Sequence, residues 1–263
     1  MTVLVTVKAY PTVSDKYGEA VCVAGIRTDV IPHEWVRLFP VHFRDLPREQ
    51  QFRKWEFIEL EARRGSEDRR PESYRPILDT IQRGRFMETG KDWAERRWHL
   101  EPFLQPSVCG PGGVHERRRA DNTSLAVIEP REVFDFSVEP AAGWTASQRG
   151  VIDQMRLGEP ERSRESLEEL PFKFRYRYYC QVSTCSGHRH SIIDWEIGQA
   201  YRSWRARYGD EQVLGKIRQK WFKELASPKR DTYFMIGNAH QFPNSFMVLG
   251  VVWPPARPQL SLF

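Results

Sequence analysis

The sequence predicts an α+β fold, in which a β-rich N-terminal part, a small barrel or curled sheet, precedes a mixed α/β unit with a zinc-binding loop. Strand-like alternation of apolar and polar residues dominates residues 1–62. Apolar positions at helical spacing are clearest in residues 211–225, in the second half of the chain. Between the two patterns lies a short segment that contains two cysteines and two histidines. These three observations define the predicted architecture.

The β-rich domain is expected to span residues 1–160. Turn residues such as Pro11, Gly18 and Asp29 separate its strand-like segments, a spacing typical of small curled sheets. The predicted strands lie at 3–8, 19–26, 35–40, 55–61, 124–128 and 133–138, and a helix is predicted at 144–157. We expect the last two strands to rejoin the first sheet.

Residues 63–121 are predicted to be a basic, irregular insertion in this domain. They are rich in Arg, Glu, Gly and Pro, and only short helices are expected, at 76–83 and 92–97. An irregular stretch of this length is usually functional or disordered. Aromatic residues such as Tyr74 and Trp98 lie among the arginines.

Arginines beside flat aromatic rings suit single-stranded or distorted nucleic acid, because phosphates need cations and unpaired bases need stacking surfaces. Solvated loops are the alternative. The nucleic-acid-binding candidates are Arg69, Arg70, Arg75, Arg117, Arg118 and Arg119.

A second, mixed α+β domain is predicted at residues 170–253. Phe172, Phe174, Tyr176 and Tyr178 alternate with basic residues, which predicts a strand with one apolar face. Helices are expected up to about residue 208 and at 211–225, and strands at 232–236 and 246–252. Residues 254–263 follow as a proline-rich tether that carries a short apolar peptide.

Composition indicates an ordinary globular protein of 263 residues, with 40% hydrophobic and 29% charged residues. No apolar run is long enough to cross a membrane, and the N-terminus lacks the pattern of a signal peptide. We therefore expect a cytoplasmic, nucleoid-associated protein without a membrane partner. The formal net charge of +5 permits binding to nucleic acid without requiring it.

The densest group of metal-ligand residue types is Cys180, Cys185, His188 and His190. Two thiolates and two imidazoles meet the ligand number of a structural zinc site, although the spacing differs from that of a usual zinc finger. The alternative is an ordinary loop after a strand, without a metal.

His190, Asp194 and Glu196 form a second group, directly after the cysteines. Imidazole and carboxylate ligands could hold Mg²⁺ or Mn²⁺ for phosphodiester hydrolysis, which makes these three the catalytic candidates. The acids equally suit the N-terminus of a helix, where they offset the helix dipole.

Glu61, Asp68 and Glu72 form an alternative acidic set beside basic residues. The segment Glu61-Ala62-Arg63 departs from the Glu-x-Lys pattern of restriction-like nucleases, because arginine replaces lysine. No Walker loop, dinucleotide fingerprint, Gly-x-Ser-x-Gly or His-Glu-x-x-His segment is present in the sequence, which argues against a nucleotide-driven motor or a serine hydrolase.

The last five residues are Gln259, Leu260, Ser261, Leu262 and Phe263. They resemble the peptide by which bacterial DNA replication and repair proteins dock on the sliding clamp, whose pattern is Gln-Leu-(Ser or Asp)-Leu-Phe. The resemblance implies that the glutamine contacts the rim of a pocket on the clamp and that the leucines and phenylalanine fill it. An apolar tail folded onto its own core is the alternative.

These features predict a protein of DNA replication, repair or genome defence that the sliding clamp recruits, acting on single-stranded or branched DNA. A metal-dependent nuclease is one form of this hypothesis. A non-catalytic module that binds clamp and DNA is the other, and an RNA-directed protein with an accidental tail match is a third possibility.

Overall fold

A computed structural model describes residues 1–65, 67–158 and 167–257 and divides the chain into two compact units. Unit 1 comprises Met1–Phe86 and Val138–Lys173, and unit 2 comprises Met87–Ser137 and Phe174–Phe263. Both units contain strands and helices, which confirms the α+β class. Within the described residues, the structure has no helix long and apolar enough to cross a membrane.

Unit 1 is built on a curled eight-stranded sheet, as predicted. Its strands are β1 (Thr2–Lys8), β2 (Thr12–Ser14), β3 (Gly18–Arg27), β4 (Glu34–Val41), β5 (Glu56–Glu59), β6 (Ala62–Arg64), β7 (Ser73–Pro76) and β8 (Gln82–Phe86). The order is β6-β7-β4-β3-β1-β5-β8, with β2 paired to β3. Short helices η1 (Phe43–Asp45), η2 (Arg48–Gln50) and η3 (Leu78–Thr80) connect strands, and α3 (Ala146–Gly158) follows later in the chain.

The core of unit 1 lies against strands β1 and β3, where Leu4 and Ile26 are fully buried and face each other in the antiparallel register. Gly25 allows the close approach of these strands, since a Cβ atom there would lie 2.3 Å from the carbonyl oxygen of Leu4. A smaller apolar cluster joins Val13, Ile152 and Leu167.

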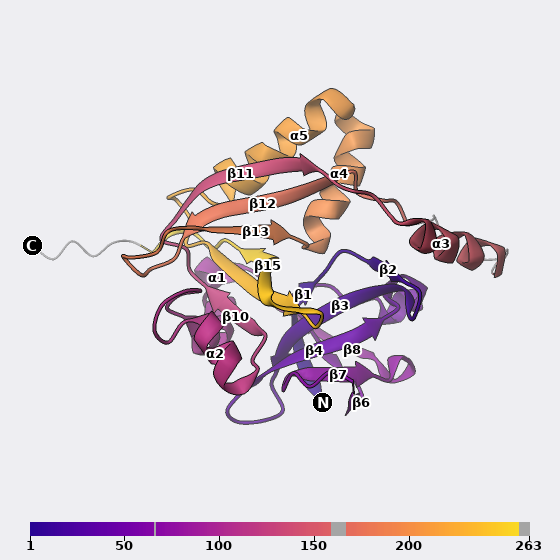
Figure 1. Ribbon diagram of the computed structural model, residues 1–263. Coiled ribbons are helices and arrows are strands. Elements are labelled where there is room, and N and C mark those ends of the chain that lie inside the picture. The colour runs from indigo at the N-terminus through magenta and orange to yellow at the C-terminus, as the bar shows by residue number, and fades with distance from the viewer. Residues whose placement is uncertain (66, 159–166, 258–263) are drawn as a thin grey trace, which may run out of the picture. The chain divides into compact units, whose positions relative to one another are not determined.

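Unit 2 contains a seven-stranded sheet in the order β11-β12-β13-β15-β14-β10-β9 (Figure 1). The strands are β9 (Leu104–Gln105), β10 (Leu125–Ile128), β11 (Glu132–Pro140), β12 (Phe172–Tyr179), β13 (His188–Ile192), β14 (Tyr233–Ala239) and β15 (Phe242–Val252). The helices are α1 (Gly90–Leu100), η4 (Glu101–Phe103), α2 (Val114–Asp121), α4 (Trp195–Tyr208), α5 (Asp210–Arg218) and η5 (Gln219–Glu224).

Strand β12 shows why this sheet takes its helical cover. Phe174, Tyr176 and Tyr178 are buried, as their alternation with basic residues predicts. The hydroxyl of Tyr176 donates a hydrogen bond to the carbonyl oxygen of Trp221 in η5 (2.7 Å), and the Phe174 ring lies 6.4 Å from that of Tyr201 in α4. The aromatic face of the strand is therefore covered by the C-terminal helices.

The predicted domain boundary near residue 160 differs from the division in the structure. Strands β10 and β11 pair with β14 and β12 in the second sheet, whereas we expected them to rejoin the first. All four residues of β10 are buried, so this strand is satisfied on both faces within unit 2.

The predicted irregular insertion at residues 63–121 is also wrong in part. This stretch contains β6, β7 and β8 in unit 1 and α1, β9 and α2 in unit 2, so it contributes to both folded units. Residues 76–83, where a helix was expected, fall in β7, η3 and β8. The expected helix at 92–97 is present within α1.

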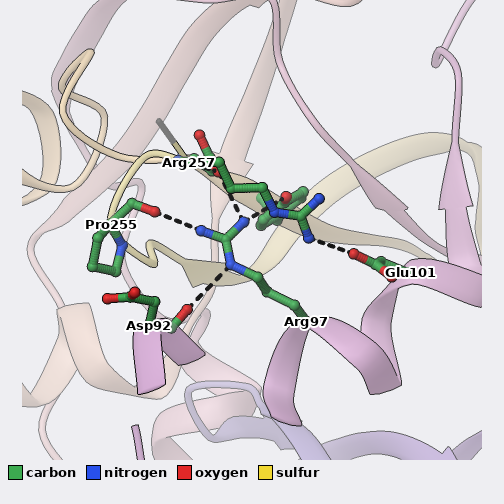
Figure 2. Close-up of polar contacts among 7 residues, drawn as sticks. Asp92, Arg97, Glu101, Pro255 and Arg257 are labelled. Atoms are coloured by element: carbon green, nitrogen blue, oxygen red, sulfur yellow. Dashed lines mark hydrogen bonds and ion pairs between the residues drawn. The ribbon is translucent and has the colours of Figure 1, made fainter. Parts of the chain in front are cut away.

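The proline-rich segment is docked on unit 2 as far as Arg257, which corrects the prediction of a tether that begins at residue 254. Pro254 is buried, and Pro255 forms a β-bridge with Arg230. Figure 2 shows Arg97 of α1 donating to the carbonyl oxygen of Pro255 (2.5 Å) and Arg257 donating to the Glu101 carboxylate (2.5 Å). The predicted docking peptide, Gln259–Leu260–Ser261–Leu262–Phe263, lies outside the described residues.

Candidate metal centre

The first part of the site is the loop between β9 and α2, which presents Cys109. Two backbone hydrogen bonds close this loop, from Val114 N–H to Ser107 O (3.0 Å) and from His115 N–H to Val108 O (3.2 Å). Gly110 adopts a φ of 82°, a left-handed conformation that glycine takes at little cost. The loop therefore holds the Cys109 side chain at a fixed place before α2 begins.

The second part is the hairpin that joins β12 to β13, which presents three ligand residue types. Cys180 follows the last residue of β12, Cys185 lies in the turn, and His188 begins β13. The backbone N–H groups of Cys180 and Gly187 both approach Cys185 Sγ, at 3.5 and 3.4 Å. Such N–H···S contacts stabilise a thiolate, which is the form that binds a metal.

Cys109, Cys180, Cys185 and His188 converge so that their ligand atoms all lie within 4.8 Å of one another. Cys109 Sγ is 3.5 Å from Cys180 Sγ, and Cys185 Sγ is 3.3 Å from His188 Nε2. Metal–sulfur bonds of about 2.3 Å in a tetrahedron place sulfur atoms roughly 3.8 Å apart, close to the separation seen here. The donor set and its dimensions therefore fit a tetrahedral metal ion.

The protonation of these groups reflects their crowding. Burial and hydrogen bonds with the neighbouring thiols raise the pKa of Cys109 to about 12. Burial also acts to raise the pKa of Cys180, but hydrogen bonds from Cys185 and the backbone outweigh it, so this pKa is lowered. The three sulfur atoms thus share negative charge, with Cys180 as the preferred thiolate. A bound cation would favour deprotonation of the other two.

Cys109 occupies the position for which the sequence predicted His190, so the prediction of His190 as fourth ligand is corrected. His190 Nδ1 lies 3.0 Å from the Tyr178 hydroxyl, in a hydrogen bond on the buried face of the sheet. Burial, and then the nearby His188, lower the pKa of His190 to about 3, so its ring is neutral. Cys180, Cys185 and His188 belong to the cluster as predicted.

Asp194 and Glu196, the other catalytic candidates, stand at the start of helix α4. Asp194 is the N-cap residue, with 1% of its surface exposed, and its carboxylate accepts a hydrogen bond from the Glu196 backbone N–H (3.1 Å). Glu196 lies in the first turn, where an acid offsets the helix dipole. This arrangement favours the structural explanation of the two acids over the catalytic one.

The two explanations predict different behaviour for two variants of Asp194. We expect Asp194→Ala to lower the free energy of unfolding by about 1–2 kcal/mol, because the cap is lost, and Asp194→Asn to retain most of it, because asparagine caps equally well. Urea denaturation followed by circular dichroism measures both. A catalytic carboxylate would instead lose its activity in both variants, and a DNA-cleavage assay with Mg²⁺ or Mn²⁺ would show that loss.

The predicted nucleic-acid-binding arginines do not form one group. Arg69, Arg70 and Arg75 belong to unit 1, and Arg117, Arg118 and Arg119 lie on α2 in unit 2. Arg70 makes a bidentate ion pair with Asp68, with its shortest N–O distance 2.6 Å. This ion pair contributes to lowering the pKa of Asp68, against the effect of burial. Arg117 and Arg119 are exposed.

The alternative acidic set is also dispersed. Asp68 pairs with Arg70, Glu72 is 4% exposed, and Glu61 is exposed at the edge of the curled sheet. Among the described residues, the group that brings three or more metal-ligand side chains together is the Cys₃His cluster, and these three acids are not part of it.

The fold and the cluster define an α+β protein whose second unit could hold a metal ion through three cysteines and a histidine. Residues 110–263 match the family model of a domain of unknown function, DUF8757, and residues 1–102 match a second domain of unknown function, DUF8758. The first match covers more than half of the chain, so the protein belongs to the DUF8757 family. A search of curated proteins found no match.

Proposed function

We propose that this chain is a DNA-transaction protein of replication, repair or genome defence that the sliding clamp recruits through residues Gln259–Phe263. The observation that carries the proposal is the full agreement of these five residues with the clamp-docking pattern. A short peptide binds usefully through a few buried aliphatic and aromatic anchors, and Leu260, Leu262 and Phe263 provide them.

The docked segment before the peptide supports this role. Arg257 is held twice, by its ion pair to Glu101 and by its backbone N–H, which donates to the Asp231 carboxylate (3.1 Å). The peptide begins two residues later. A short connection to a folded body gives a high effective concentration of that body at the clamp, so that even weak affinity for DNA suffices.

The metal centre in this proposal is a structural zinc site. Three thiolates and one imidazole are a usual donor set for structural zinc, and four protein ligands leave no open position for substrate. Zinc would fasten the Cys109 loop to the hairpin between β12 and β13. Because Asp194 caps a helix and His190 bonds to Tyr178, we favour a non-catalytic accessory protein over a metal-dependent nuclease.

Binding to purified sliding clamp tests the proposal. We expect the intact chain to bind and a chain truncated after Pro258 not to bind, as measured by surface plasmon resonance. Leu262→Ala with Phe263→Ala should weaken binding by more than about thirtyfold, since these would be hot-spot side chains. Ser261→Asp is the matched control, because aspartate also satisfies the family pattern, and it should retain binding. Equal binding by the truncated and intact chains would contradict clamp docking.

A further inference from the structure

We infer that the edge of the unit 2 sheet beside the metal loop binds single-stranded DNA. The surface, which we call the aromatic–arginine face, comprises Arg131, Phe134, Arg177, Tyr179 and Arg189. These residues come from strands β11, β12 and β13 and the turn before β11. The inference deepens the proposed function by naming the DNA-binding surface, and it differs from the arginines that the sequence predicted.

An aromatic pair lies at the centre of this face. The rings of Phe134 and Tyr179 are 4.6 Å apart with an interplanar angle of 31°. The Arg177 guanidinium lies over Phe134 (5.1 Å), and that of Arg131 lies over Tyr179 (5.4 Å). Both rings are only half-buried, whereas Phe136, two residues after Phe134, is fully buried. Partly exposed rings flanked by arginines are the elements that stack bases and contact phosphates.

Two arginines face each other across neighbouring strands on the same face. Arg177 of β12 and Arg189 of β13 are directly opposite in the antiparallel register, and both are exposed. Like charges in this position destabilise a sheet. Asp135 offsets the charge only weakly, since its carboxylate is 4.0 Å from Arg177 and the pair is 52% and 34% exposed. A bound phosphate would relieve the repulsion.

The metal loop fixes the position of this face. The Arg131 N–H donates to the carbonyl oxygen of Tyr179 (2.8 Å), and its guanidinium donates to that of Val182 (3.4 Å). Gly187 lies beneath the rings, since a Cβ atom there would be 3.4 Å from Tyr179 and 3.7 Å from Phe134. Tyr179 is followed directly by the ligand Cys180. Metal binding would therefore order the hairpin that supports the aromatic pair, as outlined in Figure 1 by the connection between β12 and β13.

Single strands suit this surface better than duplex, because only unpaired bases offer free ring faces to Phe134 and Tyr179. The experiment is fluorescence anisotropy of the full chain with labelled oligo(dT) of about 20 nucleotides, with the corresponding duplex and oligo(U) as further arms. We expect Phe134→Leu with Tyr179→Leu to weaken oligo(dT) binding roughly tenfold or more. Arg177→Gln with Arg189→Gln should also lower the salt dependence by about 1.4 in slope.

Arg117→Gln with Arg119→Gln is the matched control, because it removes the same charge from exposed positions of α2 in the same unit. We expect it to change the affinity less than about twofold, the size of a weak, non-specific charge effect. Circular dichroism and zinc content establish that each variant is folded. Equal losses in the control and the Arg177/Arg189 variant, or tighter binding to duplex than to oligo(dT), would overturn the inference.

Clamp binding separates this test from the proposed function. If the chain binds the clamp but the aromatic–arginine variants bind oligo(dT) normally, the face is wrong while recruitment stands. If the chain prefers oligo(U) and the same variants lose that binding, the face binds single strands but the assignment to DNA is overturned.

Discussion

Replacing Cys109 by serine is expected to abolish binding of one zinc ion per chain and to destabilise unit 2. Serine removes one of the four ligands and leaves the Cys109 loop without its connection to Cys180, 3.5 Å away. A metal present at about a thousand times its Kd stabilises the folded state by about 4 kcal/mol, and the variant would lose most of that contribution. Metal analysis by mass spectrometry and thermal denaturation with and without a chelator measure the two effects.

His190→Gln and Cys22→Ser are the controls for this prediction. His190 was the fourth ligand expected from the sequence, but its ring bonds to Tyr178, so the variant should still hold zinc. Cys22 lies in unit 1, on β3, and contacts Arg37 instead of the cluster. Loss of zinc in His190→Gln, together with retention in Cys109→Ser, would reverse the assignment. Zinc affinity of the intact chain should fall as the pH falls, because protons compete for the thiolates.

The contrast between these residues shows what the sequence could predict about the site. Cys180, Cys185 and His188 are close in sequence and share one hairpin, so their spacing was sufficient to group them. Cys109 precedes Cys180 by 71 residues, and it reaches the hairpin only because β9 joins the same sheet through β10 and the loop after β9 is folded back. Local spacing carries no signal for such a contact. The glycines at 110, 112 and 113 indicated a tight loop without indicating its neighbour.

The fold shows the same limit. Alternation along residues 3–8 and 172–178 correctly predicted strands, because the pattern of buried side chains is a local property of a strand. Strand partners depend on the whole chain. The apolar β10 could have extended either sheet, and its pairing with β14 rather than with the first sheet follows from packing that one sequence does not display.

Arg97→Met is expected to lower the free energy of unfolding of unit 2 by about 3 kcal/mol, the cost of breaking a largely buried charge pair. The Arg97 guanidinium is 7% exposed and bonds to the Asp231 carboxylate (2.8 Å), the Tyr233 hydroxyl (3.2 Å) and the carbonyl oxygen of Pro255 (2.5 Å). Methionine fills much of the volume but donates no hydrogen bond, so these acceptors lose their partner. Urea denaturation measures the change.

Arg257→Gln is the comparison that gives this prediction its meaning. Arg257 and Glu101 are 60% and 53% exposed, so their ion pair should contribute less than about 1 kcal/mol although it is as short as the buried contacts. Both arginines hold the segment at residues 254–257 (Figure 2). A loss in Arg97→Met no greater than that in Arg257→Gln would show that burial of the guanidinium adds little. The larger expected loss would identify Arg97 as the residue that fastens the C-terminal segment to the folded unit, and thereby sets where the docking peptide begins.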